Sequence, residues 1–573
     1  MYRGANREDY FSAGFVAFLV VCFVAAVLCF RRRFSNFDEL WCWGPMVKES
    51  LRLDRFYCVP ASRLIIHKDY PPFPAIMELL WTKTANRYSE GVVIMSMVTE
   101  SLSLVVVPLA EMLDGQEGAG EKGRKRTRLV HRAFSALMLT LLMMLVINAF
   151  DSAHVFATIM VDIPLAALFS FGLVLILSGQ ASASRFGTAM LTLTGVMLVM
   201  TKQPGLALLP ALWLACLLKD LPPRGRERRK RAVESLWVLV VPLLVFLSWH
   251  LYVKSQNIQG LRVSANGGGQ FDLAKISVQA YLDALLKRGN ALQWQTLWNL
   301  NRAFFTVSVS NLAWPPISFA TAFCLLLLGI LGLNRLCPED FDDRKARLAG
   351  IALCVMTLLF AFMMSVMFVF FFTADEMEDL RGYARYADIY VLSLLLPLAS
   401  MGILLMKRRG ILFHRLRNQL ALVLLAAVLL GSTSLIYLTP QVLQTQSYTQ
   451  YEPLADQILA HTEVDSRITV VYDIKTGRYG KWYGSLQAVV YYYANDRELL
   501  GGKDLFAADY DAEGQRAQVL RQLEESDYLF VVNTNEALNE FISPYNGGAG
   551  LAPGAIYRIE KDEKGLHLTW VEN

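Results

Sequence analysis

The sequence predicts a polytopic α-helical membrane protein with about 11 transmembrane helices and a small C-terminal α/β domain outside the cytoplasm. Of the 573 residues, 54% are hydrophobic and only 18% are charged, whereas a soluble protein is about a quarter charged. The apolar residues also gather in runs of about 18 to 25 residues, long enough to cross a hydrocarbon core about 30 Å thick as a helix. These observations predict a multi-spanning bundle.

Eleven apolar segments carry this prediction. Their ranges are 11–30, 92–112, 133–150, 156–178, 187–201, 203–218, 233–253, 316–333, 348–372, 387–406 and 418–438. The fifth and sixth are short and only Lys202-Gln203-Pro204-Gly205 separates them, which predicts a tight hairpin. The first is long, lacks a small-x-small cleavage site and ends at Arg31-Arg32-Arg33, so we interpret it as a retained anchor rather than a signal peptide.

Lysines and arginines in the loops predict the orientation. The stretches 114–132, 219–231, 334–347 and 407–417 are basic, and with eleven spans all four fall on one side. Cytoplasmic loops carry the excess of lysine and arginine. We therefore expect a multi-pass protein of the plasma membrane with a cytoplasmic N-terminus. Arg31-Arg32-Arg33 falls outside and disagrees with the four loops.

Three larger pieces are external in this topology: the loop 31–91, the loop 254–315 and the tail from about 440. We expect residues 1–439 to form the membrane module and 440–573 an extracytoplasmic domain. Within the tail, hydrophobic patterns predict strands and helices. The strands are expected at 468–472, 528–532, 555–559 and 566–570, and the helices at 484–494 and 514–525. The tail has no glycine-rich phosphate-binding motif, so no nucleotide is assigned to it.

Composition excludes some classes of function. The net charge of +5 is small, and the basic residues sit in short loops, so no nucleic acid partner is expected. The eight cysteines contain no CxxC pair, and most lie in apolar runs, where a thiol acts as a small hydrophobe. Cys42 and Cys58 fall together in a polar loop and could pair if that loop faces an oxidising compartment, which leaves a disulfide between them open. Two carboxylates can hold a divalent cation, but no ligand set has diagnostic spacing, so no cofactor or obligatory metal is expected.

Polar and ionisable residues gather on the outer side of the predicted bundle. Because such groups are costly at membrane depth, their position is informative. They occur in five motifs: Phe37-Asp38-Glu39-Leu40-Trp41, His67-Lys68-Asp69-Tyr70-Pro71-Pro72, Asp162-Ile163-Pro164, Thr201-Lys202-Gln203-Pro204-Gly205 and Arg381-Gly382-Tyr383-Ala384-Arg385-Tyr386. The double proline also predicts that a helix begins at Phe73.

Each motif alone has a structural interpretation. Asp38-Glu39 is compatible with a solvated loop or a helix cap, and Lys202 and Arg385 with anchors at the headgroups. Asp162 lies in an apolar segment, where an unpaired carboxylate costs several kcal/mol, but a hydrogen bond to a neighbouring helix would satisfy it. Together, carboxylates and cations at headgroup level suit a reaction between a lipid-linked substrate and an external acceptor, since cations hold a phosphate and a carboxylate takes a proton.

The five motifs, in this order and on this side, resemble the C-type (GT-C) membrane glycosyltransferases, especially protein O-mannosyltransferases and lipid A aminoarabinose transferases. The resemblance covers residues 1–439 and implies a GT-C-like bundle that uses a polyprenyl-phosphate sugar as donor. The departures are the sequence His67-Lys68-Asp69-Tyr70 where the family has a basic residue directly before the prolines, and the C-terminal domain, which leaves the acceptor open.

The resemblance also implies roles for individual residues. Asp38, or failing that Glu39, would be the base on the acceptor hydroxyl, and Asp162 a further catalytic carboxylate. The donor phosphate would be bound by His67, Lys68, Lys202, Arg381 and Arg385. The acceptor or the sugar would contact Trp41, Tyr70 and Tyr386. A single attack opposite the leaving phosphate inverts the anomeric configuration. The partners would be the lipid-linked sugar, the bilayer and an external glycan, lipid or protein.

Three other functions remain open at this stage. A transporter or flippase of a lipid-linked saccharide would share the lipid and the charges, but the sequence has neither internal repeats nor paired helix interruptions. A polysaccharide polymerase or ligase with a diphosphate-linked donor would use arginines in the loop 254–315, which contains Arg262, Arg288 and Arg302. A non-catalytic scaffold would bind wall components through aromatic residues of the tail such as Tyr491-Tyr492-Tyr493, although these suit a core.

Overall fold

The structure is a computed structural model, and its description covers most of the chain. The described residues are 11–64, 67–114, 125–152, 156–179, 184–220, 226–258, 277–312, 316–336, 338–339, 341–370, 372, 374–408, 418–430, 452–471, 490–494, 498–500, 513–563 and 565–571. The chain forms two compact units. The first, the helical unit, comprises Met1–Arg32 and Asp69–Gln444, and the second, the mixed unit, comprises Arg33–Lys68 and Thr445–Asn573. Residues 33–68, the first part of the loop 31–91, thus belong to the same compact unit as the tail, and the expected boundary at residue 439 stays a prediction.

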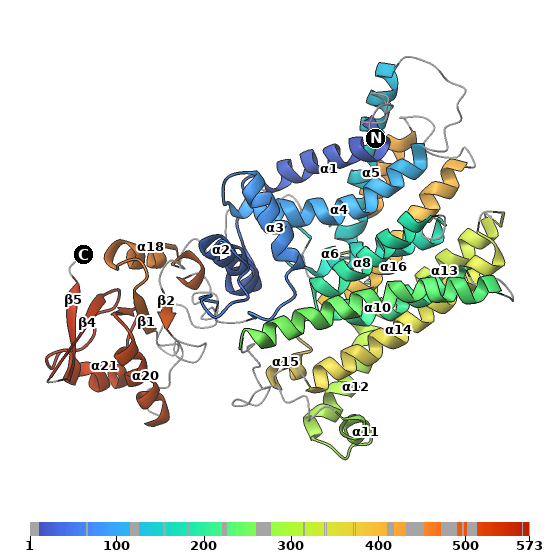
Figure 1. Cartoon of the computed structure of the whole chain (residues 1–573). Coiled ribbons are helices and arrows are strands. Elements are labelled where there is room, and N and C mark those ends of the chain that lie inside the picture. The colour runs from blue at the N-terminus through green and yellow to red at the C-terminus, as the bar shows by residue number, and fades with distance from the viewer. Residues whose placement is uncertain are drawn as a thin grey trace. The chain divides into compact units, whose positions relative to one another are not determined.

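The helical unit consists of long helices that pack side by side (Figure 1). Its helices are α1 (Ala13–Cys29), α3 (Phe73–Thr84), α4 (Glu90–Asp114), α5 (Lys125–Ala149), α6 (Asp162–Leu177), α8 (Arg185–Thr201), α9 (Pro204–Asp220), α10 (Arg226–Ser255), α11 (Val278–Leu285), α12 (Ala291–Thr306), α13 (Phe319–Leu336), α14 (Asp343–Phe370), α15 (Ala374–Asp379) and α16 (Tyr383–Arg408). The helix predicted to start at Phe73 does so as α3, with Pro72 as its N-cap.

Several of these helices are apolar and long enough to cross a membrane. Among the described residues there are six: Glu90–Asp114, Leu129–Ala149, Ala232–Ser255, Phe319–Leu336, Ala346–Phe370 and Tyr383–Arg408. Shorter apolar helices occupy Ala13–Cys29, Asp162–Leu177, Arg185–Thr201, Pro204–Leu217 and Asn418–Leu430. Every expected apolar segment overlaps one of these helices, which confirms a helical membrane protein. The number of eleven spans and the sidedness of the termini stay predictions.

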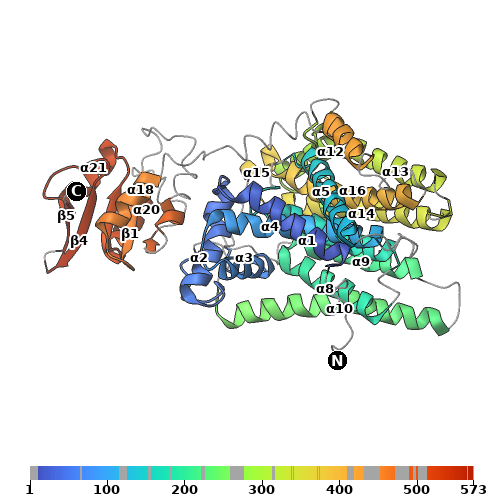
Figure 2. The ribbon, with the colours of Figure 1, turned by 90° about the horizontal axis from the view of Figure 1, so that it is seen from above.

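Burial distinguishes the centre of the helical unit from its periphery. Helix α6 is buried along nearly its whole length and contacts α4, α8, α9 and α16. Helix α10, at the edge of the bundle in Figure 2, exposes Leu243, Leu244, Leu247 and Leu251. A helix with apolar residues all round belongs in a core or in lipid. Helix α6 therefore forms the core, and the exposed leucines of α10 suit contact with lipid tails.

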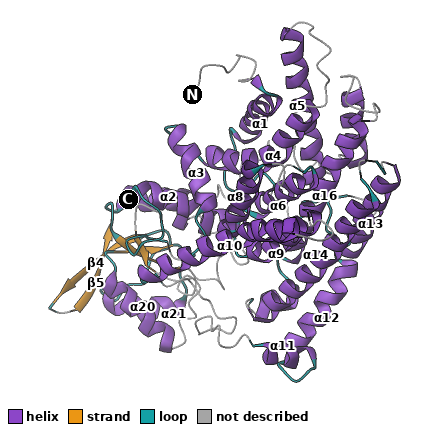
Figure 3. Cartoon of the chain, turned by 45° about the vertical axis from the view of Figure 1, so that its right-hand side comes forward, coloured by secondary structure: helices purple, strands orange, loops and turns teal. Residues whose placement is uncertain are grey.

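The mixed unit contains a five-stranded sheet (orange in Figure 3). Its strands are β1 (Arg467–Val471), β2 (Glu498–Leu500), β3 (Tyr528–Val531), β4 (Ile556–Asp562) and β5 (Gly565–Val571) in the order β2-β1-β3-β4-β5. Strands β1, β2 and β3 are parallel, whereas β4 and β5 are antiparallel to their neighbours. The helices are η2 (Glu39–Trp43, a π-helix), α2 (Gly44–Leu53), α18 (Glu452–His461), α20 (Glu513–Glu525), α21 (Glu536–Ile542) and the 3-10 turn η6 (Ser543–Tyr545).

The four strands expected in the tail match β1, β3, β4 and β5, and the helix expected at 514–525 matches α20. Strand β2 was not predicted. The helix expected at 484–494 lies largely outside the described residues, of which 490–493 are helical. Val471, Leu529 and Val531 of the sheet pack with Val519 and Leu523 of α20 in one apolar core. This burial explains why the alternating and helical patterns were readable from the sequence.

Candidate functional site

A buried carboxylate lies beside two cations at the start of α6, the end of α8 and the start of α16. Asp162 opens α6 and has 1% of its surface exposed. Its Oδ1 lies 3.2 Å from Nζ of Lys202, which donates a hydrogen bond to it, and its Oδ2 lies 3.6 Å from Nε of Arg385. The amino end of a helix carries a partial positive charge that also favours an anion. We call Asp162, Lys202, Arg385 and Tyr386 the cation cluster.

The turn between α8 and α9 positions Lys202. Lys202 has an extended backbone (φ −163°, ψ 155°) directly after α8 ends at Thr201, and Pro204 starts α9. The N–H of Gly205 donates to the carbonyl of Lys202 at 2.9 Å. A Cβ on Gly205 would lie only 2.0 Å from the carbonyl oxygen of Leu198. Because no side chain fits there, glycine is required for the two helices to approach and for Lys202 to reach Asp162.

An aromatic ring completes the cluster. Nζ of Lys202 lies 5.4 Å and Cζ of Arg385 5.3 Å from the centre of the Tyr386 ring. The face of an aromatic ring attracts cations. The four residues of the cluster by themselves have one carboxylate against two cations. A further buried carboxylate, Asp388, follows one helical turn after Arg385 and accepts hydrogen bonds from the hydroxyl of Ser152. The excess of one positive charge within the cluster favours an additional anion, because charges interact more strongly where water is scarce.

Two apolar cavities lie among the helices of the helical unit, and Tyr386 lines the smaller one. This first cavity has about 20 Å³ and is lined by Pro204, Ala207, Leu208, Met356, Leu359, Phe360, Met363, Tyr386, Ile389 and Tyr390. The second has about 90 Å³ and is lined from α6, α9, α13, α14 and α16, by residues that include Leu173, Ala211, Leu326, Val355 and Leu394. On α9 and α16 its lining begins about one helical turn beyond that of the first cavity. Tyr390 of the first cavity donates a hydrogen bond of 2.9 Å to the carbonyl of Leu353, which lines the second. We call these cavities the apolar seam.

Two further candidates of the helical unit lie outside the cation cluster. The side chain of Arg381 is 63% exposed and lies 3.7 Å from the exposed Asp379. Tyr70 is half-buried, next to Asp69, whose carbonyl accepts a hydrogen bond of 3.1 Å from the indole of Trp249. The structure therefore brings together Asp162, Lys202, Arg385 and Tyr386 but places Arg381 at the surface.

The predicted acidic pair belongs to the mixed unit. Oε2 of Glu39 accepts hydrogen bonds from the backbone N–H groups of Ser35 and Asn36, at 2.7 and 2.8 Å, and Glu39 is 1% exposed. Asp38 is half-buried, and its own N–H donates to Oδ1 of Asn36 at 3.0 Å. Glu39 therefore stabilises the loop backbone, and Asp38 is the more accessible carboxylate of the pair.

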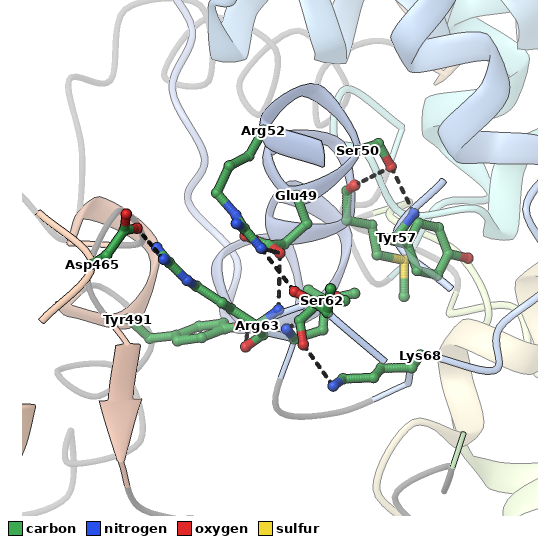
Figure 4. Close-up of polar contacts among 12 residues, drawn as sticks. Glu49, Ser50, Arg52, Tyr57, Ser62, Arg63, Lys68, Asp465 and Tyr491 are labelled. Carbon is green, nitrogen blue, oxygen red and sulfur yellow. Dashed lines mark hydrogen bonds and ion pairs between the residues drawn. The ribbon is translucent and has the colours of Figure 1, made fainter. Parts of the chain in front are cut away.

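Trp41, His67 and Lys68 are also in the mixed unit. Trp41 is buried and stacks on Phe37 with 5.8 Å between the ring centres. Nζ of Lys68 donates to the carbonyl of Ser62 at 2.7 Å, as Figure 4 shows, and His67 has a left-handed backbone with φ of 56°. The predicted roles of these residues in binding a donor phosphate or a sugar stay predictions.

Two solved structures that resemble this chain are oligosaccharyltransferases. One is the oligosaccharyltransferase of Archaeoglobus fulgidus in complex with Zn and sulfate, at 12% identity and a TM-score of 0.44, covering 97% of this chain and 73% of that one. Another is the archaeal oligosaccharyltransferase AglB of the same organism with an inhibitory peptide and a dolichol-phosphate, at 12% identity and a TM-score of 0.39, covering 97% and 74%.

No family model matches the chain, and no curated protein matches it. Both solved structures have TM-scores below 0.5, so the function is argued from the residues of this chain alone.

One buried carboxylate near the cluster was missed at the sequence level. Asp388, one helical turn after Arg385 on α16, is 1% exposed and accepts hydrogen bonds of 2.9 and 2.8 Å from the hydroxyl of Ser152. The signal was available, because a carboxylate in an apolar helix is as costly there as at Asp162. Among the described residues, no group of three or more His, Cys, Asp or Glu side chains forms a metal site.

Proposed function

We propose that this chain is a membrane glycosyltransferase that moves a sugar from a polyprenyl-phosphate donor to the hydroxyl of an acceptor outside the cytoplasm. The observation that carries the proposal is the cation cluster at one end of the apolar seam. A lipid phosphate needs cations for its head and an apolar path for its tail, and these features adjoin at Tyr386.

The cation cluster supports the leaving-group chemistry. As the bond between the anomeric carbon and the phosphate oxygen breaks, negative charge develops on the lipid phosphate. Lys202 and Arg385 are held by Asp162 before any substrate arrives, so little reorganisation is needed to stabilise that charge. Because its own charge is compensated by two cations, Asp162 suits the positioning of these cations better than the uptake of a proton.

The acceptor side of the reaction requires a base. We assign this role to Asp38, since it is more accessible than Glu39, whose carboxylate is bonded to backbone N–H groups. The acceptor oxygen forms a bond to the anomeric carbon, its proton passes to Asp38, and the electron pair of the broken bond leaves with the polyprenyl phosphate. One displacement of this kind inverts the anomeric configuration and needs no covalent intermediate, unlike a retaining glycosidase.

The test is sugar transfer by the purified full-length chain in nanodiscs, with polyprenyl-phosphate sugars as donors and envelope glycans, lipids and peptides as acceptors. We expect transfer by the wild-type protein, with the anomeric configuration inverted, and a loss of about 10²-fold or more in kcat for Asp38→Asn. Glu39→Gln serves as the neighbouring control and is expected to affect stability more than kcat. Full activity of Asp38→Asn would remove the proposed base.

The same assay separates this proposal from its rivals. A flippase moves lipid across a sealed bilayer and releases no free carrier in detergent, whereas a transferase consumes the donor there. A polymerase or ligase consumes only diphosphate-linked donors. Turnover of a monophosphate donor in detergent therefore supports the proposal, and turnover restricted to the diphosphate form contradicts it.

A further inference from the structure

A second set of contacts joins the acidic pair to the C-terminal part of the mixed unit. We define the acidic turn as residues 34–44, which contain Asp38, Glu39 and the π-helix η2. π-Helices are rare and often lie at functional sites. The acidic turn is followed by α2, and its contacts reach residues 490–494, more than 440 positions later in the chain.

Two tyrosines hold the aromatic residues on either side of Asp38. Phe34 is 2% exposed, and its ring centre lies 5.4 Å from that of Tyr492. Trp41 is 5% exposed and meets Tyr491 edge-on at 5.1 Å. Aromatic pairs of this kind contribute about 0.5–1.5 kcal/mol beyond the area that they bury. Since Asp38 lies between Phe34 and Trp41 in the sequence, both ends of its segment are fixed.

The packing at the end of the acidic turn leaves no room for a side chain on Gly44. A Cβ there would lie 2.5 Å from Cε2 of Phe34, 2.7 Å from the carbonyl oxygen of Glu39 and 2.9 Å from Cε2 of Tyr492. Lys48, one turn further along α2, donates from Nζ to the carbonyl of Tyr492 at 2.7 Å and lies 3.6 Å from the centre of its ring. Glycine at position 44 is thus what allows Phe34 and Tyr492 to meet.

Ion pairs tie both ends of the segment 33–68 to the C-terminal part. Arg33 pairs through Nη1 with both oxygens of Glu452, each at 2.8 Å. Arg63 pairs with Asp465 and accepts, at its carbonyl, a hydrogen bond of 3.5 Å from the hydroxyl of Tyr491 (Figure 4). Arg33 and Asp465 are partly exposed, and pairs of this kind contribute little. The aromatic contacts are therefore the main source of the attachment.

We propose that the C-terminal domain is a positioning element for the acidic turn, and that Tyr491 and Tyr492 are positioning residues that fix the orientation of Asp38. The inference rests on the proposed function, in which Asp38 takes the proton of the acceptor. It assigns the domain a role in the reaction that requires no binding of sugar by the domain itself. Tyr491 and Tyr492 are buried against the acidic turn rather than offered as a stacking surface for glycans.

The experiment uses full-length protein in nanodiscs and two readouts. Hydrogen–deuterium exchange of peptides covering 34–44 reports the contact, and transfer kinetics report its use. For both Tyr492→Leu and Gly44→Ala, we expect exchange in 34–44 to become about 10-fold faster and kcat about 10-fold lower, because an aromatic contact is lost or displaced. The KM for the donor lipid is expected to stay unchanged, since Lys202 and Arg385 are in the other unit.

The controls separate a positioning role from a general loss of folding. Tyr492→Phe keeps the aromatic ring, so its exchange and kcat are expected to equal those of the wild type. Tyr545→Leu removes a tyrosine that packs on Phe541, at 6.5 Å between ring centres, and is expected to leave the exchange of the acidic turn unchanged.

The methyl group of Gly44→Ala also approaches the carbonyl of Glu39 within the acidic turn. Tyr491→Leu, which removes the contact with Trp41 and leaves the acidic turn unchanged in sequence, is therefore the further variant where Tyr492→Leu fails to fold, with the same expected result.

The inference is overturned by wild-type exchange in 34–44 for both Tyr492→Leu and Gly44→Ala, or by faster exchange with an unchanged kcat. Equal losses of kcat in Tyr545→Leu would also overturn it, because the effect would then be one of general stability. If the wild-type protein transfers no sugar, the proposed function fails and its catalytic consequence here fails with it, while faster exchange would still establish the contact.

Discussion

Two buried carboxylates, Asp162 in the helical unit and Glu49 in the mixed unit, meet their cations in different ways. Glu49 is 2% exposed and receives two short hydrogen bonds from Arg52, of 2.9 and 2.7 Å, and one of 2.9 Å from the N–H of Arg63 (Figure 4). Asp162 has one hydrogen bond of 3.2 Å from Lys202 and a longer contact of 3.6 Å with Arg385.

The difference in bonding indicates a difference in purpose. A bidentate pair of one arginine and one carboxylate is neutral and has a fixed geometry, so Glu49 holds together the loop that it shares with Arg63. The Asp162 cluster has looser contacts and one more cation than anion. A lysine ammonium has three donors, and the contact with Asp162 uses one. The first arrangement is expected to serve stability, and the second to serve binding of an anion.

Lys202→Ala should give the largest loss of transfer activity. If activity stayed unchanged, the comparison between Asp162 and Glu49 would no longer hold. The variant removes a cation from the place where charge develops on the leaving phosphate, so we expect kcat/KM for transfer to fall by about 10²–10³-fold. The unfolding midpoint should also fall, because the buried carboxylate of Asp162 loses its hydrogen bond from Lys202. Lys202→Arg keeps the charge and should retain part of the activity. Wild-type kinetics in Lys202→Ala would show that the cluster is only structural.

Glu49→Ala should act on stability instead of binding. It leaves Arg52 and the N–H of Arg63 without their acceptor, which costs about 1.5–3 kcal/mol for bonds to a charged group. We expect a lower unfolding midpoint of the mixed unit and an unchanged KM for the donor. The matched control is Glu463→Ala, whose carboxylate is 75% exposed in its pair with Arg558 and should cost at most about 1 kcal/mol. Equal losses in both variants would contradict the structural role of Glu49.

Arg381→Ala should give the smallest change in kcat/KM. The variant tests whether the cation cluster includes Arg381. Its side chain is 63% exposed, and at such a position salt screens most of its interaction with a bound anion. We expect kcat/KM within about 2-fold of the wild type, against a much larger loss for Arg385→Ala. Transfer assays at two salt concentrations measure both. A loss in Arg381→Ala as large as in Arg385→Ala would place Arg381 in the donor site.

Much of the fold was predictable because it follows from local patterns. The apolar runs became helices, and the alternating segments of the tail became β1, β3, β4 and β5. The convergence of Asp162, Lys202 and Arg385 was also predictable, although they come from distant motifs. Each stands at the end of an apolar run, and the ends of packed helices meet at one level. Asp388 lies three residues after Arg385 in the same segment, but no motif of the resemblance assigns it a role.

The attachment of residues 33–68 to the tail was not predictable from a single sequence. It depends on Phe34 and Trp41 meeting Tyr492 and Tyr491, and neither partner's local pattern specifies the other. The choice within the acidic pair had the same limit. From the sequence alone, Asp38 and Glu39 are equally suitable as a base. The structure distinguishes them, because the backbone N–H groups of Ser35 and Asn36 donate to Glu39, whereas Asp38 is the more accessible carboxylate.

The carboxylate of Asp162 also has a consequence for repeated turnover. Two cations facing a spent lipid phosphate with no other anion nearby would retain it tightly and slow its release. In the proposed reaction, Asp162 stays beside Lys202 and Arg385 throughout and balances part of their charge once the carrier has left. The same carboxylate would then lower the affinity for the incoming donor and speed the release of the spent carrier.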